Sequence, residues 1–454
     1  MSFFFFLRRL LPGLLGLGVV SALAQQPPVK PTAPTPSSLA WLDQAVRESG
    51  VLRRHHVGIC LTDVADGAPL YEFNADRYFT PASTMKLFSL YAGLHLLPDS
   101  LPSLRYVVRH DSLVFWGTGD PTLLHGDVPS GRALNFLRTR PERLFYADMP
   151  TVAAFGPSWS WDDYNYYFQP ERGAFPVYGH TVRFYAKAGQ PLPRVYPRFF
   201  RPLTELAPAG TPNPTNDHVR RSLGENRFSV FSNPKNWVDE TPFRTSPALL
   251  LQLLQDTLRR PVLRAPFRLR PQETVHTLRG LPVDSLYRRM IRVSDNFLAE
   301  QLLLMCSSTL GSDSLSTTRT IRLMRQRYLV GLPDAVTWTD GSGLSRLNLV
   351  TPRTLVAMLL RLHTEVPEPR LLNLLAAGGG QGTLRRRYRP VGTGGPWLWG
   401  KTGTLTNNHN LVGYLRTKSG RLLAFSFMNN NLPGDDAPVR NEMERILTQV
   451  RERL

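Results

Sequence analysis

The chain has 454 residues, of which 42% are hydrophobic, and its formal net charge at pH 7 is +19. This length is too great for one small core, and the apolar content is ample for globular cores, so we expect two or three folded domains. The positive charge favours anionic partners, namely nucleic acid, anionic lipid or acidic wall polymers, unless it is only a solvated arginine-rich surface.

Residues 1–24 are typical of a secretory signal peptide. Arg8 and Arg9 precede an apolar run that ends in the small-x-small sequence Ala-Leu-Ala at 22–24. The run is too short and too rich in glycine for a membrane span, and no later segment is apolar enough to cross a bilayer. We therefore expect an exported protein of the periplasm or cell envelope, without a transmembrane segment after signal removal. Export argues against nucleic acid as a partner.

The first predicted elements follow the signal. Residues 25–38 are rich in proline, which predicts an extended linker. A short helix is expected over 39–49, and it should end at Gly50. Two strands, 57–62 and 69–73, should then form a hairpin around a turn rich in aspartate and glycine.

A second helix is expected to begin near Pro81, since proline is favoured in the first turn of a helix. Its apolar residues repeat every three to four positions and can bury one face of the helix. This stripe consists of Met85, Phe88, Ala92 and Leu96.

From about residue 98 the sequence changes to short aromatic-rich runs broken by prolines and glycines. We interpret 98–275 as β-rich inserted material that forms one or two small domains. Helical patterns return at 295–310 and 351–365. They are followed by a hairpin pattern over 410–430 and a helix from about 436.

This order of elements predicts an α/β (α+β) fold. Residues 39–97 and 276–454 should together form one layered domain, with the β-rich insert between them in the sequence. Segments from both sides of the insert would therefore meet in the same sheet and core.

Three short motifs occur in order along the chain. The first is S-x-x-K, with Ser83 and Lys86 three residues apart at the start of the second helix. The second is S-D-N at 294–296, directly before a helical pattern, and the third is K-T-G at 401–403, directly before the final hairpin. Each motif alone is weak, but together they match the signature of class A β-lactamases and penicillin-binding proteins.

The spacing within the first motif has a chemical meaning. Residues three apart lie on one face of a helix, so the Lys86 amine can lie beside the Ser83 hydroxyl. Free backbone N–H groups of the first turn favour developing negative charge. Lys86 accepts a proton at neutral pH only if its pKa falls far below the ordinary value of about 10.4, and burial and a second cation such as Lys401 would both lower it.

Lysine is rare in this chain, which draws attention to Lys86. The 54 basic residues include only six lysines, and arginine is used elsewhere. Lysine can lose its proton in a protein, whereas arginine cannot. A lysine beside a possible nucleophile therefore suggests a base. The lysines are Lys30, Lys86, Lys187, Lys235, Lys401 and Lys418.

The other two motifs supply groups that acyl transfer to a serine would need. Ser294 can relay a proton to the leaving group, and Asn296 can orient the catalytic lysine and hold a substrate amide. The hydroxyls of Thr402 and Thr404 can bind a substrate carboxylate. The N–H of Thr404 and that of the nucleophile can form an oxyanion hole, in which one donor typically contributes roughly a hundred- to thousandfold in rate.

With these motifs the chain resembles the D-alanyl-D-alanine carboxypeptidases and endopeptidases of penicillin-binding protein 4 type, the low-molecular-mass class C penicillin-binding proteins. The 207 residues between the first and second motifs are also typical of that family. Four further segments are similar to it: GTGDPTL at 117–123, WSWDDYNYYF at 159–168, DGSGLSRLNLVTP at 340–352 and GKTGTL at 400–405.

The resemblance implies a penicillin-recognising transpeptidase/β-lactamase-like domain with a large β-rich insert between the first and second motifs. It also implies a serine-acyl enzyme that cleaves peptidoglycan stem peptides and is inhibited by β-lactams. By position, Asp163 and Arg346 would contact the diamino-acid side chain of the substrate; otherwise they belong to a solvated turn and a braced loop. The expected catalytic residues are Ser83, Lys86, Ser294, Asn296 and Lys401, and the expected substrate contacts are Thr402, Gly403, Thr404, Asp163 and Arg346.

No cofactor or metal site is predicted, because the ten histidines form no spaced cluster with cysteines or carboxylates. Cys60 and Cys306 either pair as a disulfide in an oxidising compartment or remain buried thiols. No oligomeric state is predicted.

A competing pattern overlaps the third motif. Residues 395–402 match G-x-x-x-x-G-K-T, the phosphate-loop pattern of nucleotide-binding proteins. However, Pro396 lacks a backbone N–H, two tryptophans crowd the segment, and the following sequence predicts a strand where a phosphate loop needs a helix. We therefore prefer the K-T-G interpretation.

Two alternative functions stay open. A β-lactamase usually needs a glutamate after the second motif to activate water, and we identify no residue with that role in FLAEQLLLMC, residues 297–306, or beyond. A non-catalytic, cell-wall-binding relative would keep the fold without turnover, although such a protein should have lost at least one motif residue.

Overall fold

The computed structural model describes residues 39–454 except 151, 312–313, 391 and 393. The predicted signal peptide, 1–24, and the predicted linker, 25–38, lie outside the described residues. Within the described part, no helix is both long enough and apolar enough to span a bilayer.

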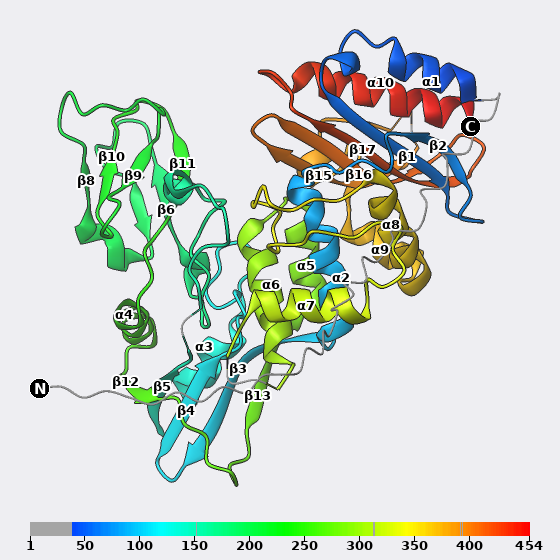
Figure 1. Ribbon diagram of the computed structural model, residues 1–454. Helices are drawn as coiled ribbons and strands as arrows, with labels where there is room; N and C mark the ends of the chain where they lie inside the picture. The colour runs from blue at the N-terminus through cyan, green and yellow to red at the C-terminus, as the bar shows by residue number, and fades with distance from the viewer. Residues whose placement is uncertain (1–38, 151, 312–313, 391, 393) are drawn as a thin grey trace, which may run out of the picture. The chain divides into compact units, whose positions relative to one another are not determined.

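A six-stranded antiparallel sheet, here called the large sheet, carries the third motif. Its strand order is β14-β15-β16-β17-β1-β2 (Figure 1). β1 pairs with β17 along its whole length, so segments from both sides of the insert share this sheet, and both predicted hairpins are confirmed. The strands are β1 (His56–Asp63), β2 (Pro69–Phe73), β14 (Ala376–Ala377), β15 (Leu398–Leu405), β16 (Asn408–Arg416) and β17 (Leu422–Asn430).

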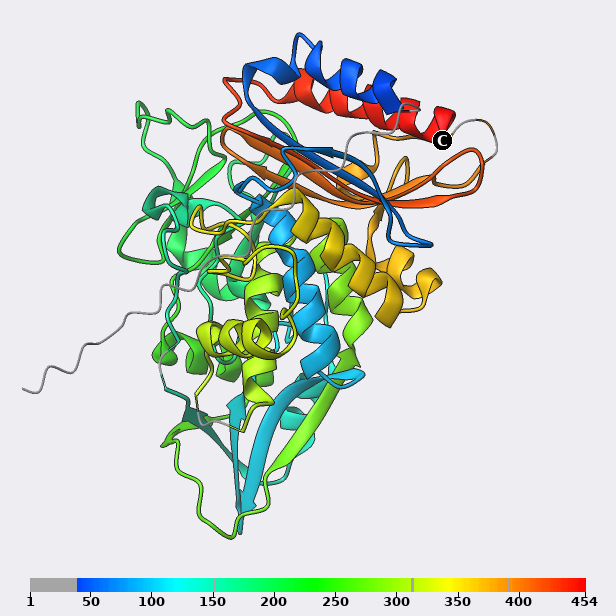
Figure 2. The ribbon, with the colours of Figure 1, turned by 45° about the vertical axis from the view of Figure 1, so that its right-hand side comes forward.

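Two helices cover one face of the large sheet. α1 (Ala40–Arg47) and α10 (Ala437–Arg453) lie side by side there (Figures 1 and 2). Their apolar side chains form one core cluster with residues of β1, β16 and β17. The predicted first and last helices are therefore confirmed, because each buries one apolar stripe against the same surface.

α2 (Lys86–Leu96) lies on the other side of the large sheet and is enclosed by α5 (Val283–Arg292), α6 (Asn296–Ser308) and α8 (Pro352–Glu365). Met85, Phe88 and Ala92 of the predicted stripe are buried, and Leu96 is partly buried. Every residue from Lys86 to Gly93 is buried as well. The pattern thus predicted one buried face correctly, and the neighbouring helices bury the others.

The start of this helix differs from the prediction. A 3-10 turn, Ala82–Met85, precedes α2, which begins only at Lys86. Ala82 has a φ of 50°, a left-handed conformation that an α-helix does not accommodate. Ser83 therefore lies in a tight turn directly before the helix, and such strained backbone is often found at functional sites.

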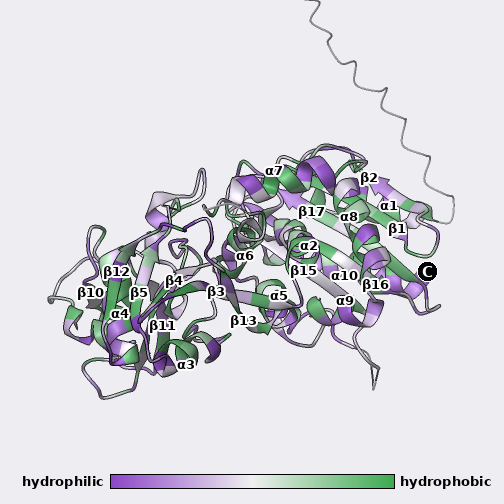
Figure 3. Cartoon of the chain, turned by 90° about the horizontal axis from the view of Figure 1, so that it is seen from below, coloured by the Kyte–Doolittle hydropathy of each residue, from purple (hydrophilic) through white to green (hydrophobic). Residues whose placement is uncertain are grey.

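α6 (Asn296–Ser308) begins at the second motif. The Asp295 side chain accepts a hydrogen bond from the Leu298 N–H at 3.1 Å and caps the helix. All residues from Phe297 to Ser308 are buried, whereas α7 beside it carries hydrophilic segments (Figure 3). The other helices outside the insert are α5 (Val283–Arg292), α7 (Thr317–Arg327), α8 (Pro352–Glu365) and α9 (Glu368–Leu374).

The insert is β-rich, as predicted. β12, β5, β4, β3 and β13 form one sheet in that order, and two three-stranded sheets have the orders β8-β10-β9 and β11-β6-β7. β13 begins at His276, just beyond the expected boundary of 98–275, and pairs with β3. The domain division stays a prediction, with this edge strand on its outer side.

The described part of the insert contains two α-helices besides its strands. The helices are α3 (Arg132–Thr139) and α4 (Pro247–Leu258), and the strands are β3 (Ser100–Arg109), β4 (Ser112–Gly117), β5 (Arg143–Asp148), β6 (Thr181–Ala186), β7 (Arg194–Tyr196), β8 (Thr204–Leu206), β9 (Val219–Arg221), β10 (Phe228–Val230), β11 (Trp237–Pro242) and β12 (Val262–Pro266). β13 (His276–Pro282) follows directly after the expected boundary. α4 has a regular N-terminus, since Ser246 accepts a hydrogen bond from the Leu249 N–H and proline follows at the first helical position.

The two cysteines are not joined. Cys60 in β1 and Cys306 in α6 are both free and buried. Burial raises the pKa of both thiols, which keeps them protonated and unreactive. Of the two alternatives, the structure supports buried thiols.

Candidate active site

The three motifs meet beside the large sheet. The turn Ala82–Met85 and the start of α2 carry the first motif, the loop before α6 carries the second, and β15 carries the third. β15 packs directly against the turn that holds Ser83. Residues more than 200 positions apart in the sequence therefore form one cluster.

Lys86 lies at the centre of this cluster. Its Nζ donates hydrogen bonds to Ser83 Oγ at 2.9 Å, to Asn296 Oδ1 at 2.6 Å and to the Ser342 carbonyl at 2.7 Å. Three acceptors match the three hydrogens of an ammonium group. A neutral amine has one hydrogen fewer and a lone pair, so it can accept the serine proton while the two remaining bonds hold it in place.

The surroundings of Lys86 favour its neutral form. The side chain is fully buried, and burial lowers the pKa of its amine to about 8. The negative charges of Asp340, Asp295 and Glu300 act in the opposite direction and limit the change. At pH 7 roughly one amine in ten is then neutral, against about one in a few thousand for an ordinary lysine. The group is therefore suited to act as a base.

Lys401 forms a second buried amine. Its Nζ donates to Ser294 Oγ at 2.8 Å and to the Thr402 carbonyl at 2.5 Å. Burial and then the positive charge of Lys86 lower the pKa of Lys401 well below its ordinary value. The sequence predicts that this repulsion lowers the pKa of Lys86, whereas in the structure it lowers the pKa of Lys401. An amine of low pKa beside Ser294 can exchange a proton with that hydroxyl.

The residues around the start of α6 are fixed by the fold. Ser294 has a φ of 66°, so the backbone turns sharply between α5 and α6. Asn296 is the first residue of α6, and its Nδ2 donates to the Phe168 carbonyl at 3.0 Å while its Oδ1 accepts from Lys86. The amide is thus oriented by the insert on one side and by the lysine on the other. These two contacts do not use the second N–H hydrogen of the amide.

Gly403 allows β15 to approach the turn that holds Ser83. A Cβ at this position would lie 2.5 Å from the Pro81 carbonyl oxygen and 3.0 Å from the Thr84 nitrogen. Real side chains do not tolerate such contacts, so only glycine fits without movement of one segment. An oxyanion hole shared by β15 and the turn needs this close approach.

The two threonines of β15 border a cleft of about 750 Å³. Thr402 Oγ1 donates to Thr383 Oγ1 at 2.9 Å, and Thr404 Oγ1 lies 2.9 Å from His409 Nδ1. The sequence did not single out Thr383 or the arginines near it, because nothing in their local pattern marks them. The cleft is also lined by Tyr167, Val293, Arg385 and Arg386.

Asp163 and Arg346 lie close enough to interact electrostatically. Burial raises the pKa of Asp163, as does the neighbouring charge of Asp162, while the positive charge of Arg346 lowers it. Arg346 is exposed and donates to the Thr406 carbonyl at 3.1 Å, two residues beyond Thr404. The structure therefore brings both residues together near the end of β15, and their roles toward substrate stay predictions.

The structure contradicts the phosphate-loop pattern. β15 is a strand from Leu398 to Leu405, so the lysine and threonine of that pattern lie within a strand and no helix follows them. A phosphate loop needs free N–H groups before a helix. Among the described residues there is also no group of three or more histidines, cysteines and carboxylates placed to hold a metal ion.

Two contacts of the site come from backbone carbonyls that the sequence could not single out. The Ser342 carbonyl accepts from Lys86 and the Phe168 carbonyl accepts from Asn296. Every residue has a carbonyl, so no residue type marks such a contact. The only signal was the similarity of the segments 159–168 and 340–352 to one family.

The fold and the arrangement of the three motifs are of the penicillin-recognising type, and comparison with known proteins identifies the family. Residues 39–450 match the D-Ala-D-Ala carboxypeptidase 3 (S13) family. The chain belongs to this family, which confirms the resemblance carried by the three motifs.

Curated relatives show the same similarity. Carboxypeptidase DacB of Mycolicibacterium smegmatis is 32% identical over 172 residues, and the match covers 37% of either chain. The chain thus matches little more than a third of the length of this relative. D-alanyl-D-alanine carboxypeptidase of Actinomadura sp. is 27% identical over 447 residues, which is 86% of this chain and 80% of that protein.

The fold also matches a solved structure. Penicillin binding protein 4 (dacB) from Haemophilus influenzae superposes with a TM-score of 0.70 at 20% identity, covering 91% of this chain and 99% of that one. The same protein in complex with a β-lactam superposes with a TM-score of 0.64. The predicted penicillin-recognising fold is therefore confirmed.

Proposed function

We propose that this protein is a penicillin-sensitive, serine-type D-Ala-D-Ala carboxypeptidase or endopeptidase that acts on peptidoglycan stem peptides through an acyl-enzyme on Ser83. The observation that carries the proposal is the hydrogen bond between Ser83 Oγ and the fully buried amine of Lys86. Asn296 and Ser342 hold that amine in place. Membership of the family supports the same chemistry.

The reaction follows from this geometry. Neutral Lys86 accepts the Ser83 proton, and the serine oxygen attacks the carbonyl carbon of the penultimate D-alanine. The N–H groups of Ser83 and Thr404 stabilise the oxyanion. The peptide C–N bond then breaks, and the leaving amine takes a proton through Ser294, which Lys401 supports. Water hydrolyses the ester by the same acid and base steps and frees Ser83.

The cleft beside β15 supports an anionic peptide as substrate. Arg385 and Arg386 line it and are exposed, whereas Arg387 next to them is paired with Glu444. Carboxylates of a stem peptide would complement this charge. We further propose that the protein is exported and works in the cell envelope, where peptidoglycan and β-lactams are found.

The alternative of a β-lactamase is not favoured by the structure. Glu300 is the glutamate nearest to the second motif, and both of its carboxylate oxygens are engaged, one by the Ser342 N–H and one by Arg172. It therefore lacks a free oxygen to activate a deacylating water. The motif residues are all present and in contact, which also argues against a non-catalytic relative.

The proposal is tested by locating the covalent adduct. Purified protein incubated with a fluorescent penicillin should gain one label, and mass spectrometry of its peptides should place that label on Ser83. Heat-denatured protein is the control and should remain unlabelled. Digestion of purified peptidoglycan should release D-alanine or uncrosslinked peptides. An adduct at another residue, or native protein without any label, would refute the acyl-serine proposal.

Asp163→Asn tests substrate recognition. A carboxylate near the cleft would bind the free amine of a diamino acid, so we expect KM for such a stem peptide to rise roughly tenfold, in line with a lost ionic hydrogen bond. Steady-state hydrolysis of stem peptides measures this. Acylation by a penicillin that has no amine should be unchanged.

The matched control for this substitution is Asp162→Asn, which removes the adjacent and exposed carboxylate. It should leave KM unchanged. Equal effects of the two substitutions would mean that Asp163 belongs only to a solvated turn.

A further inference from the structure

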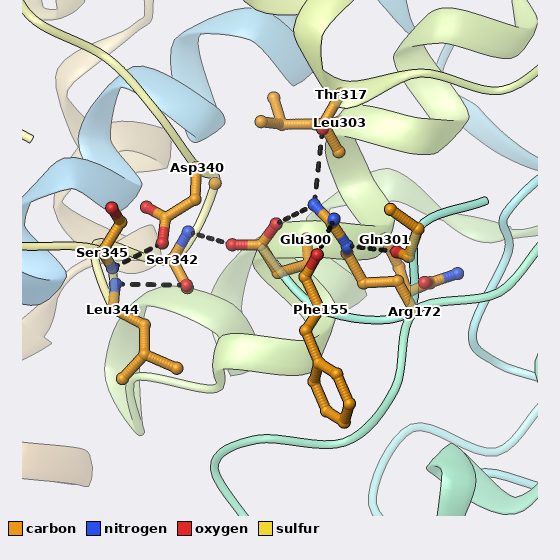
Figure 4. A network of polar contacts seen from close by, with 12 residues as sticks. Phe155, Arg172, Glu300, Gln301, Leu303, Thr317, Asp340, Ser342, Leu344 and Ser345 are labelled. Carbon is orange, nitrogen blue, oxygen red and sulfur yellow. Dashed lines mark hydrogen bonds and ion pairs between the residues drawn. The ribbon is translucent and has the colours of Figure 1, made fainter. Parts of the chain in front are cut away.

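A buried ion pair joins the insert to the peptide segment that holds Lys86. Glu300 lies on the second turn of α6, and Arg172 belongs to the insert (Figure 4). Their exposed fractions are 1% and 5%. Charged side chains are rarely buried so completely unless they are paired and hydrogen-bonded.

Glu300 uses its two oxygens in different directions. One oxygen accepts the Ser342 N–H at 2.7 Å, and the other accepts Arg172 Nη1 at 3.3 Å. The carbonyl of the same Ser342 accepts the Lys86 amine at 2.7 Å. Ser342 is thus held at its N–H by Glu300 and holds Lys86 by its carbonyl.

Arg172 is fixed by several contacts, most of them within the insert. Its guanidinium donates to the carbonyls of Ala153 and Phe155 at 3.1 Å and 2.6 Å, and to Thr317 Oγ1 at 3.4 Å (Figure 4). It also lies over the ring of Trp159, 5.5 Å from the centroid. A cation held in this way cannot follow Glu300 if that side chain moves.

The other charged groups around Lys86 make their hydrogen bonds to other parts of the site. Asp340 accepts from the N–H groups of Gly343 and Ser345 and from the Asn348 amide, so it shapes the loop that contains Ser342. Asp295 caps α6, and Lys401 contacts Ser294. Among the described acidic side chains, Glu300 is the one that hydrogen-bonds Ser342 directly.

We propose that Glu300 is a positioning residue for the base Lys86 and acts through the Ser342 peptide. Arg172, which belongs to the insert, holds the Glu300 side chain, so the insert takes part in positioning the base. This inference rests on the proposed function, since Glu300 can position a base only if Lys86 is that base. Glu300 holds the acceptor that orients the amine, and its negative charge stabilises the ammonium form.

The electrostatics agree with this geometry. Burial, with the charge of Asp340, raises the pKa of Glu300 to about 6, and Arg172 acts against this rise. Glu300 is therefore mostly ionised at pH 7. Its charge is one of three that raise the pKa of Lys86 against the effect of burial. Removal of that charge, with Arg172 left unpaired, should lower the pKa of Lys86 further.

Glu300→Gln tests the charge. The glutamine oxygen can still accept the Ser342 N–H, so the loop keeps its bond while the negative charge is lost. The measurement is the second-order rate of acylation by a fluorescent penicillin between pH 5 and 10. The acidic limb of this profile is the range in which the rate rises with pH as Lys86 loses its proton. It should move to lower pH by roughly one pH unit. A merely structural role would lower the rate or the melting temperature without moving the limb.

Glu300→Asp tests the position. The charge remains, but the shorter side chain cannot reach Ser342 and Arg172 together. The maximal rate of acylation should fall about tenfold, while the acidic limb of the pH profile stays at the wild-type pH. This variant also keeps the proposal testable if the glutamine variant fails to fold. The control is Glu442→Gln, which breaks another glutamate–arginine pair, on α10, and should leave the profile unchanged.

The outcomes separate the two proposals. Wild-type protein that gains no label on Ser83 refutes the proposed function, and this inference with it. Wild-type protein that is labelled, together with a glutamine variant whose limb stays in place, refutes the inference alone. An aspartate variant with full maximal rate also contradicts it.

Discussion

Lys86→Arg should slow acylation at pH 7 as strongly as Lys86→Ala, by roughly a hundred- to ten-thousandfold, the usual contribution of a general base. Arginine keeps the positive charge but cannot give up its proton, and its planar guanidinium does not fit three acceptors arranged around one nitrogen. If Lys86 contributed only its charge, the arginine variant would keep most of the activity. The rate of labelling by a fluorescent penicillin measures the difference.

Lys418→Arg is the matched control for this substitution, since it replaces another of the six lysines at an exposed position beside Glu452. It should label at the wild-type rate. An Lys86→Arg variant that retained more than a tenth of that rate would contradict the assignment of Lys86 as the base.

The same amine sets the pH dependence of the wild-type protein. Its pKa in the folded protein is about 8, lowered from 10.5, so the neutral base form accumulates as the pH rises toward 8. Acylation should therefore accelerate about tenfold per pH unit below that value and level off above it. A rate that falls between pH 6 and 8 would mean that the protonated amine is the active form.

Gly403→Ala should slow acylation by roughly a hundred- to thousandfold, the typical effect of losing one oxyanion donor. The added methyl group would meet the Pro81 carbonyl oxygen and the Thr84 nitrogen, which are backbone atoms at the turn before α2 and cannot rotate away. β15 would have to move outward, and the Thr404 N–H would move with it. We also expect about 1–3 kcal/mol of destabilisation from overpacking.

Gly50→Ala provides the control, because no atom lies within 4 Å of a Cβ at that position. Both variants add one methyl group, so their rates of labelling and their urea midpoints can be compared directly. Normal labelling of the Gly403 variant would show that β15 and the turn tolerate a wider separation.

The side-chain chemistry of the site could be predicted from sequence, because each motif lies within a few residues of a helix or strand start. A spacing of three residues places Ser83 and Lys86 side by side without knowledge of the fold, in the 3-10 turn that leads into α2 as it would in an α-helix. The helix start itself was predicted at Pro81, whereas the left-handed Ala82 delays it to Lys86. β15 and the loop of Gly343, which come from distant parts of the sequence, lie directly against this turn, and local sequence does not show that packing.

The boundary of the insert could not be predicted from sequence, because it depends on the pairing of strands that lie far apart along the chain. Residues from 276 onward were expected to lie outside the insert, yet β13, which begins at His276, pairs with β3, more than 160 residues earlier. The Glu300–Arg172 pair was missed for the same reason, since a buried ion pair has no local pattern. Its members are a single glutamate in an apolar helix and one arginine among 48.

The pairing of β1 with β17 bears on when the protein becomes active. β1 is made early, but its partner strand is completed only when Asn430 has been synthesised, and β15 joins the same sheet through β16. Contacts between such distant segments form late in folding. A nascent chain therefore carries Ser83 and Lys86 long before it has the strand that completes their site. Such a chain should be unable to acylate until nearly all of it has been synthesised.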